Sequence, residues 1–172
     1  PRIEKLEAIV KPERVQMATV DIVDIAGLVK GASKGEGLGN QFLGNIRECN
    51  AIIHVLRCFD NDNIVHVDGN VNPIRNKETI DIELQLKDLD TVDKRLEKVK
   101  RAAKTGNKEA QVEEAFLNRI REALLQAKSA RTVEPKNVDE EELMENFQLI
   151  TSKPVLYVCN VDEGSAVNGN KY

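Results

Sequence analysis

Three short apolar segments along the chain have the composition of buried β-strands. Residues 19–25 are rich in β-branched side chains, residues 51–59 form a nearly continuous apolar run, and residues 155–159 form another that follows Pro154. A glycine-rich stretch and a helical pattern separate the first two segments. This order of strand, loop, helix and strand predicts a βαβ unit with parallel strands. The expected fold class is therefore α/β, built on a parallel sheet.

The segments around this sheet show the helical spacing of apolar residues. An amphipathic helix is expected at the start of the chain and ends at the Lys11-Pro12 pair, because a proline disfavours helical backbone in the residue before it. A second helix follows the glycine-rich stretch, where Asn40 is placed to cap its N-terminus. The apolar face of this second helix consists of Phe42, Leu43, Ile46 and Cys49.

Far more residues separate the second and third apolar segments than a crossover between parallel strands requires. Within this interval, apolar residues step by three and four along residues 79–104 and again along residues 108–131, with Thr105-Gly106-Asn107 between them. The spacing predicts an antiparallel coiled-coil hairpin with arms about 35 Å long. Two ordinary helices packed on the sheet are the alternative. The apolar positions are Leu89, Val92, Leu96, Val99 and Ala103 in the first arm and Leu117, Ile120, Leu124 and Ala127 in the second.

A shorter acidic helix over residues 139–146 is expected to return the chain to the sheet.

Composition narrows the class of protein. The chain has 172 residues with a net charge of −4, and 41% of its residues are hydrophobic but only 3% aromatic, which favours a globular protein with an aliphatic core. No apolar run is long enough to span a membrane, and three widely spaced cysteines form no metal pair, so a cytoplasmic protein is expected. Two cysteines and both histidines are interpreted as structural or surface residues: Cys49, Cys58, His54 and His66.

The glycines are unevenly distributed, since six of the ten fall between residues 27 and 44. They follow Asp24-Ile-Ala-Gly27, which matches the pattern D-x-x-G at the end of the first predicted strand. An aspartate there can hold Mg²⁺ through its water shell, and the glycine N–H can meet a terminal phosphate. A strand followed by an ordinary turn is the alternative, but so many glycines favour a loop that changes shape.

A second polar motif, Asn160-Val-Asp-Glu163, follows the third predicted strand. GTPases carry N-K-x-D at this place to recognise guanine. Val161 replaces the lysine, and Glu163 is one methylene longer than the aspartate. The motif is therefore expected to recognise guanine less strictly or to tolerate adenine. This favours ATP as the nucleotide, with GTP as the alternative.

Together and in this order, these stretches resemble the YchF (Obg-like ATPase) family of P-loop NTPases. The resemblance covers nearly the whole chain and includes a coiled-coil insertion at the same point. It implies a partial Ras-like P-loop NTPase sheet with an inserted antiparallel helical hairpin, as an internal piece of a bacterial protein. The segments that carry it are residues 24–43, 45–49, 54–59, 64–67 and 160–163.

The resemblance also implies roles for single residues. It makes Asp24 the Mg²⁺-side carboxylate, acting through water, and Gly27 the sensor of the γ-phosphate. Leu28 stands where Ras-like enzymes have a water-orienting glutamine, and since an aliphatic side chain cannot orient water, slow intrinsic turnover is implied. The implied base pocket consists of Asn160, Val161 and Glu163.

The parent protein implied by the resemblance is associated with the ribosome and hydrolyses ATP, or GTP, to the diphosphate and phosphate with Mg²⁺. The chain contains no G-x-x-x-x-G-K-[ST] phosphate loop. The resemblance implies that the C-terminal domain of the family is also missing from this piece. We therefore expect the chain alone to bind nucleotide poorly and not to hydrolyse it. Residues 1–78 and 134–172 are interpreted as two parts of the nucleotide-binding domain, with the coiled-coil insertion over residues 79–133.

A basic segment lies near the predicted hairpin tip, where residues 94–104 carry six basic side chains and one acidic one, Glu97. Contact with RNA phosphates is the functional interpretation, and a solvated helix face is the alternative. If this surface acts without nucleotide chemistry, the chain is a non-catalytic helical-arm module that binds RNA or protein partners. The basic residues are Lys94, Arg95, Lys98, Lys100, Arg101 and Lys104.

Overall fold

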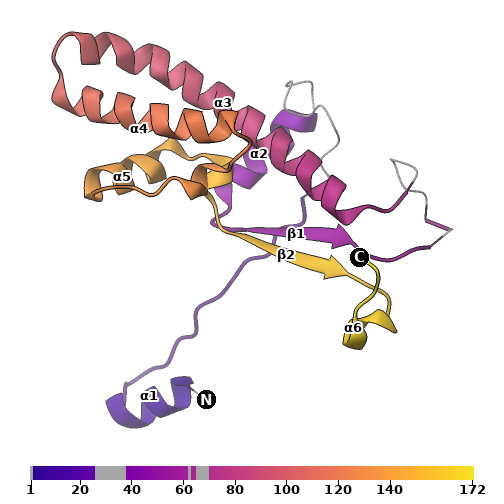
Figure 1. Ribbon diagram of the computed structural model, residues 1–172. Coiled ribbons are helices and arrows are strands. Elements are labelled where there is room, and N and C mark those ends of the chain that lie inside the picture. The colour runs from indigo at the N-terminus through magenta and orange to yellow at the C-terminus, as the bar shows by residue number, and fades with distance from the viewer. Residues whose placement is uncertain (1, 26–37, 62, 65–69) are drawn as a thin grey trace.

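Figure 1 shows the computed structural model of the chain, which describes residues 2–25, 38–61, 63–64 and 70–172. The α-helices are α1 (Arg2–Val10), α2 (Leu38–Glu48), α3 (Pro73–Lys104), α4 (Lys108–Leu125), α5 (Val138–Phe147) and α6 (Ser165–Asn168). The strands are β1 (Ile52–Arg57) and β2 (Val155–Asn160), and two 3₁₀ helices are η2 (Ala130–Thr132) and η3 (Ile150–Ser152).

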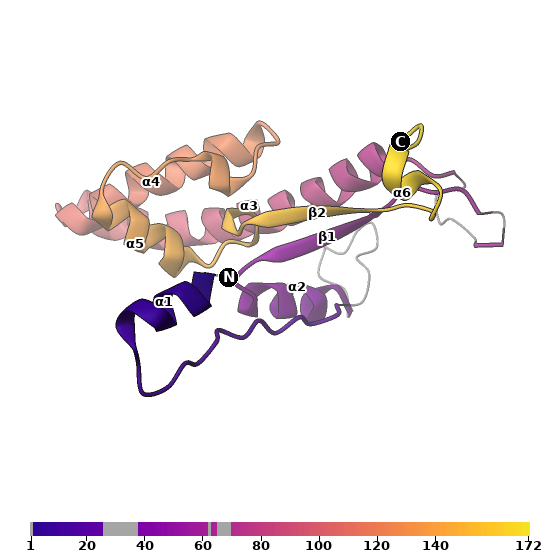
Figure 2. The ribbon, with the colours of Figure 1, turned by 90° about the horizontal axis from the view of Figure 1, so that it is seen from below.

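The two strands form a parallel sheet, as the apolar segments predict. The register runs from Ile52 opposite Val155 to Arg57 opposite Asn160. The first half of α3 runs along this sheet (Figure 2), and α2 contacts η3, just before β2. The chain between β1 and β2 contains the helical insertion, so the expected α/β class with an inserted helical hairpin is confirmed.

The expected strand over residues 19–25 is wrong. These residues have no regular secondary structure, and the side chains of Val20 and Ile22 are 84% and 80% exposed. A strand is stabilised by hydrogen bonds to a neighbour, which β-branched composition cannot supply by itself. Among the described residues, the sheet consists of β1 and β2 alone. Only Ile25, at the end of this segment, packs against a core cluster.

The helical hairpin is confirmed, but its two arms differ in length. At 1.5 Å per residue, α3 with 32 residues is about 48 Å long and α4 with 18 residues is about 27 Å long, against the expected 35 Å. The second arm is shorter because α4 ends at Leu125, and Ala127 is exposed in the left-handed region with φ 55°.

The turn between the two arms of the hairpin has the backbone conformation and the helix cap that its residue types favour. Gly106 has φ 90°, which favours glycine, and the side chain of Asn107 accepts a hydrogen bond from the N–H of Ala110 as the N-cap of α4. Asn72 caps α3 in the same way, through the N–H of Arg75.

A main core joins the hairpin to α5, which lies against α4 in Figure 1. Phe116 and Phe147 meet in this core with ring centroids 5.9 Å apart. The helix over Val138–Phe147 contains the predicted acidic helix of residues 139–146, and its N-cap is Asn137. The buried members of the cluster are Val92, Leu96, Phe116, Leu117, Ile120, Leu124, Ala130, Phe147 and Leu149.

A second, smaller core holds α2 against α3. It consists of Leu43, Ile46, Leu84 and Ile150, with the partly buried Ile25, Ile52 and Ile80 packed against it. Helix α2 begins at Leu38, two residues before Asn40, so the expected cap at Asn40 is wrong.

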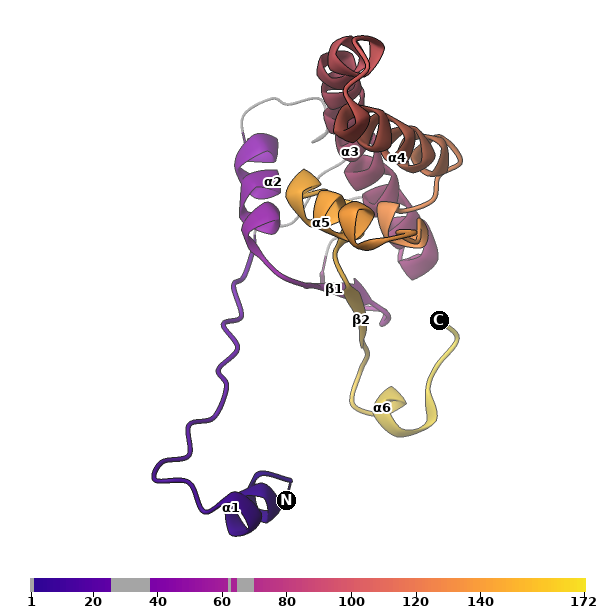
Figure 3. The ribbon, with the colours of Figure 1, turned by 90° about the vertical axis from the view of Figure 1, so that its left-hand side faces the viewer.

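Helix α1 forms over the predicted residues and ends before Lys11. Its apolar side chains are exposed, with Leu6 at 59% and Ile9 at 77%. Figure 3 shows it apart from the other helices. None of the described helices is both long and apolar enough to cross a membrane.

Candidate functional site

The predicted base motif lies where β2 ends. Asn160 is the last residue of the strand, and its carbonyl accepts a hydrogen bond of 2.8 Å from the N–H of Cys58, just beyond β1. The side chain of Asn160 is exposed and that of Val161 is half-buried. The motif therefore occupies the carboxyl edge of a parallel sheet, which is where α/β proteins bind ligands.

Within this motif, Asp162 and Glu163 have different environments. The Oδ1 atom of Asp162 accepts hydrogen bonds from the N–H of Ser165 at 2.9 Å and from its hydroxyl at 2.8 Å. These hydrogen bonds from Ser165 lower the pKa of Asp162. Glu163 is exposed, and its carboxylate has no hydrogen-bond partner in the described part of the chain. Asp162 thus shapes the turn, and Glu163 stays available to a ligand.

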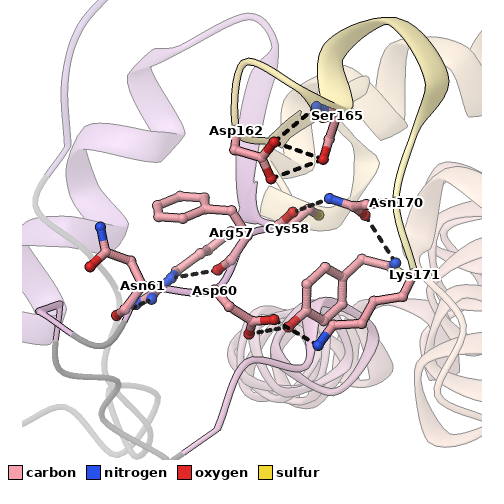
Figure 4. A network of polar contacts seen from close by, with 10 residues as sticks. Arg57, Cys58, Asp60, Asn61, Asp162, Ser165, Asn170 and Lys171 are labelled. Carbon is pink, nitrogen blue, oxygen red and sulfur yellow. Dashed lines mark hydrogen bonds and ion pairs between the residues drawn. The ribbon is translucent and has the colours of Figure 1, made fainter.

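Polar contacts hold the end of the chain against the turn that follows β1 (Figure 4). The amide of Asn170 donates to the carbonyl of Cys58 at 2.7 Å. Asp60 accepts a hydrogen bond from the hydroxyl of Tyr172 and pairs with Lys171 at 2.6 Å. The hydrogen bond from Lys171, followed by that from Tyr172, lowers the pKa of Asp60.

The turn after β1 is itself ordered by Arg57. Its guanidinium donates to the carbonyls of Phe59, Asn61 and Ile64, each at 3.2 Å. Sequence reasoning missed this arrangement, since a strand-terminal arginine and an Asn-x-Asn turn carry no distinctive pattern.

The D-x-x-G segment is described only in part. Asp24 is exposed at the end of the irregular segment, while Ile25 beside it packs on the smaller core. Gly27 and Leu28 lie outside the described residues. No cluster of three or more His, Cys, Asp or Glu side chains suited to a metal occurs among residues that the structure describes. A single exposed carboxylate is still compatible with Mg²⁺, which keeps several waters and binds through one or two carboxylates and phosphates.

The basic residues of the hairpin divide into two groups. Lys94, Lys98 and Arg101 recur at helical spacing on the solvent side of α3 and are exposed. Arg95 is turned inward, where its Nε bonds Glu113 at 2.5 Å and its guanidinium lies 4.6 Å from the centre of the Phe147 ring. Lys100 and Lys104 are exposed as well.

The structure describes three of the four histidine and cysteine residues that were interpreted as structural or surface residues. His54 lies in β1 with its ring 5.6 Å from that of Tyr157. Burial raises the pKa of the Cys58 thiol, and Cys159 adds to the effect. The thiol of Cys49 bonds the carbonyl of Asn45 within α2. His66 lies outside the described residues.

A buried carboxylate that sequence reasoning missed lies between α3 and η3. Asp88 is fully buried and accepts hydrogen bonds from the N–H groups of Ile150 and Thr151 at 2.9 and 2.7 Å. Burial raises the pKa of Asp88, against the effect of these hydrogen bonds. Two residues after Thr151, the ammonium of Lys153 donates hydrogen bonds to the carbonyls of Arg47 and Cys49, at the C-terminal end of α2 and just beyond it. The residues that lead into β2 thus tie α2 and α3 together.

The chain matches known proteins over nearly its whole length. Residues 5–105 match the family described as 50S ribosome-binding GTPase. A protein of Pasteurella multocida named ribosome-binding ATPase YchF is 46% identical over 168 residues, which cover 98% of this chain and 46% of that protein. One of the same name from Bacillus subtilis is 46% identical over 172 residues, covering 99% of this chain and 47% of that protein.

A solved structure, that of the Schizosaccharomyces pombe YchF GTPase, aligns with a TM-score of 0.76 and 36% identity over 99% of this chain and 47% of that one. The chain spans about half the length of the relatives it matches. The match over more than half of its residues shows that the chain belongs to the 50S ribosome-binding GTPase family, in which it is similar to the proteins named YchF.

Proposed function

We propose that this chain contributes the switch segment and the base-recognition segment of a nucleotide-switch hydrolase. The substrate is ATP, with GTP as the alternative, and the products are the diphosphate and phosphate. The observation that carries the proposal is the free carboxylate of Glu163 at the carboxyl edge of the sheet, beside Asp162, which is held by Ser165. Asn160 and Val161 complete the base pocket, and the added methylene of Glu163 relaxes selectivity for guanine.

In the switch segment, which begins at Asp24, three residues are assigned roles in nucleotide hydrolysis. Asp24 would hold Mg²⁺ through its water shell, and the backbone N–H of Gly27 would contact the γ-phosphate. Bound Mg²⁺ supplies neutralisation of charge on the phosphate oxygens. Leu28 orients no water, so intrinsic turnover is slow.

The chain alone does not hydrolyse nucleotide, because its sequence contains no phosphate-loop motif. Residues 1–78 and 134–172 are parts of the nucleotide-binding domain, and residues 79–133 are the inserted arm, although α3 itself begins at Pro73. The protein acts in the cytoplasm.

The test of the switch is Asp24→Asn in a protein of the relatives' full length that contains this chain. We expect ATP turnover at saturating Mg²⁺ to fall about tenfold or more, since removing a catalytic electrostatic contact typically costs that much. Asp21→Asn is the matched control, because Asp21 is an exposed aspartate in the same irregular segment. Equal turnover in both variants and the unmodified protein overturns the proposal.

The partner is the ribosome, which the relatives' names say they bind. The arm makes the contact, through RNA phosphates on the exposed Lys98, Lys100 and Arg101. Charge reversal of these three residues to glutamate is expected to abolish co-sedimentation with ribosomes, whereas Lys128→Glu, on an exposed lysine beyond the end of α4, leaves it intact. Unchanged co-sedimentation of the triple variant contradicts the assignment.

A second candidate function is a non-catalytic binding module, which the exposed basic face of a long hairpin favours. The two functions differ in nucleotide dependence. If ribosome binding by the full-length protein is the same with ATP, with ADP and without nucleotide, the module interpretation stands and the switch fails.

A further inference from the structure

A lysine from a distant part of the chain holds the C-terminal end of α2. The ammonium of Lys153 donates hydrogen bonds to the backbone carbonyls of Arg47, at 3.0 Å, and Cys49, at 2.6 Å. Helix α2 ends at Glu48, and the last carbonyls of a helix have no partner within it. A cation at this end satisfies them and suits the helix dipole. We name these two hydrogen bonds the Lys153 bridge.

The bridge joins two segments that lead to the candidate nucleotide site. Helix α2 follows the D-x-x-G segment in the sequence, and Lys153 stands two residues before β2, which ends at the base motif. Lys153 is half-buried and has no carboxylate partner among the residues that the structure describes. Its charge is therefore directed at the end of α2 instead of at a surface ion pair.

The backbone that carries Lys153 is itself fixed by the arm. Asp88 of α3 accepts hydrogen bonds from the N–H groups of Ile150 and Thr151. The guanidinium of Arg131 donates to the carbonyls of Thr151, at 3.2 Å, and Lys153, at 3.4 Å. Movement of this segment would leave buried groups unpaired, which is costly. The bridge therefore sets the position of α2 against a fixed support.

The packing that the bridge maintains extends to the residue assigned to Mg²⁺. Two residues of α2, Leu43 and Ile46, pack with Ile150 in the smaller core, and Ile25 packs against the same core. Asp24, beside Ile25, is exposed, and no hydrogen bond within the described ranges of the chain holds its carboxylate. The position of Asp24 therefore depends on where Ile25 packs, and so on how α2 is held against Ile150.

We propose that Lys153 is a positioning residue for the Mg²⁺ side of the nucleotide site, and that it acts on Asp24 through α2 and Ile25. The proposal rests on the proposed function, in which Asp24 holds Mg²⁺ through water. In this role Lys153 contacts neither the nucleotide nor the metal ion. A displacement of about 1 Å caused far from the chemistry can cost about a hundredfold in rate, so loss of two remote hydrogen bonds is enough to change turnover.

The test uses a protein of the relatives' full length that contains this chain. Lys153→Met removes the donors and nearly keeps the length of the side chain, whereas Lys153→Arg keeps the charge and the donors. Lys128→Met, on an exposed lysine beyond the end of α4, is the matched control. The affinity for N-methylanthraniloyl-ADP is measured by fluorescence with Mg²⁺ and with EDTA. Turnover of ATP and the thermal midpoint are measured separately.

In Lys153→Met, the gain in affinity for the ADP probe on adding Mg²⁺ is expected to fall several-fold, while the affinity in EDTA stays unchanged. The kcat for ATP is expected to fall about tenfold, and Lys153→Arg restores most of both quantities. Combined with Asp24→Asn, Lys153→Met is expected to add no further loss, because residues that act through one another are not additive.

Two results overturn the proposal. One is a Mg²⁺-dependent gain in Lys153→Met equal to that in Lys128→Met, even with a lowered thermal midpoint, which makes the bridge only a cap that stabilises α2. The other is full additivity of Lys153→Met with Asp24→Asn. If Lys153→Met does not fold, Ile25→Ala decides, since it removes the packing contact through which the bridge acts. An unchanged Mg²⁺-dependent gain in Ile25→Ala also overturns the proposal.

Failure of the bridge and failure of the proposed function are distinguishable. A loss in Asp24→Asn with no loss in Lys153→Met contradicts the bridge alone. No loss in Asp24→Asn contradicts the nucleotide switch itself.

Discussion

Thr151 donates both its backbone N–H and its hydroxyl to the same carboxylate oxygen of Asp88, each at 2.7 Å. The two residues are fully or nearly fully buried, one on α3 and the other in η3 just before β2. The hydroxyl of Thr151 also accepts the N–H of Ala130 at 3.0 Å. One side-chain pair therefore joins the helical arm to the strand that ends at the base motif.

The first prediction concerns this pair. Asp88→Ala is expected to lower the free energy of unfolding by about 3 kcal/mol, because it leaves the buried donors of Ile150 and Thr151 without an acceptor. Urea denaturation followed by circular dichroism measures it. Asp90→Ala, two residues along the same helix, removes only an exposed ion pair and is expected to cost under about 0.5 kcal/mol. Equal midpoints for the two variants would contradict a structural role for Asp88.

The second prediction is a pH dependence of stability. Burial lowers the pKa of His54 from its ordinary 6.5, with Asp81 raising it and Lys77 lowering it by smaller amounts. Below pH 6.5 the unfolded chain therefore binds a proton that the folded chain does not. Stability is expected to rise with pH from the lowered pKa up to 6.5 and then to level off.

His54→Gln removes this titration. Urea midpoints measured from pH 5.0 to 7.5 are expected to rise less steeply below pH 6.5 in the variant than in the unmodified chain. Parallel profiles for the two proteins would show that His54 is not responsible.

The third prediction uses two glycines that both have room for a methyl group, since an added Cβ meets nothing within 4 Å at either. Gly106 has φ 90°, so Gly106→Ala is expected to cost about 1 kcal/mol. Gly44 is inside α2, so Gly44→Ala is expected to stabilise the protein by about 0.5–1 kcal/mol. Thermal denaturation of the two variants should show midpoint shifts of opposite sign. Shifts of the same sign would contradict the backbone explanation.

The fourth prediction addresses base selectivity. Val161→Lys with Glu163→Asp restores the N-K-x-D pattern, and the shorter carboxylate then suits the paired N1–H and N2 amine of guanine. In a protein of the relatives' full length, the ratio of kcat/KM for GTP over ATP is expected to rise about tenfold or more. Ser165→Ala, which removes one hydrogen bond to Asp162 but leaves Glu163, serves as the control for disturbance of the turn. An unchanged ratio in the double variant excludes Glu163 as the base-reading residue.

The spacing of apolar and turn residues predicted the parts of the fold that are stabilised by interactions between residues close together in the sequence. The three-four spacing along α3 and α4 and the Thr105-Gly106-Asn107 turn were sufficient for the hairpin, because a narrow apolar stripe and a capped turn act over a few residues. Pattern failed at residues 19–25, which have no regular secondary structure, and at Ala127, where the helical spacing continues after the helix has ended. At residues 19–25, strand formation required a neighbouring strand from elsewhere in the chain. At Ala127, a left-handed backbone conformation ended the helical pattern.

The sequence by itself determined the class of fold, the hairpin, and the motifs that indicate nucleotide chemistry, because each depends on residue types at short spacing. Only the tertiary structure decided which of several chemically similar side chains have hydrogen-bond or packing partners and which do not. Asp162 is held by Ser165 while Glu163 is free, and Arg95 packs on Phe147 while Arg47 keeps a buried donor unpaired. Burial and hydrogen-bond partners come from segments far apart in the chain, and no local spacing encodes them.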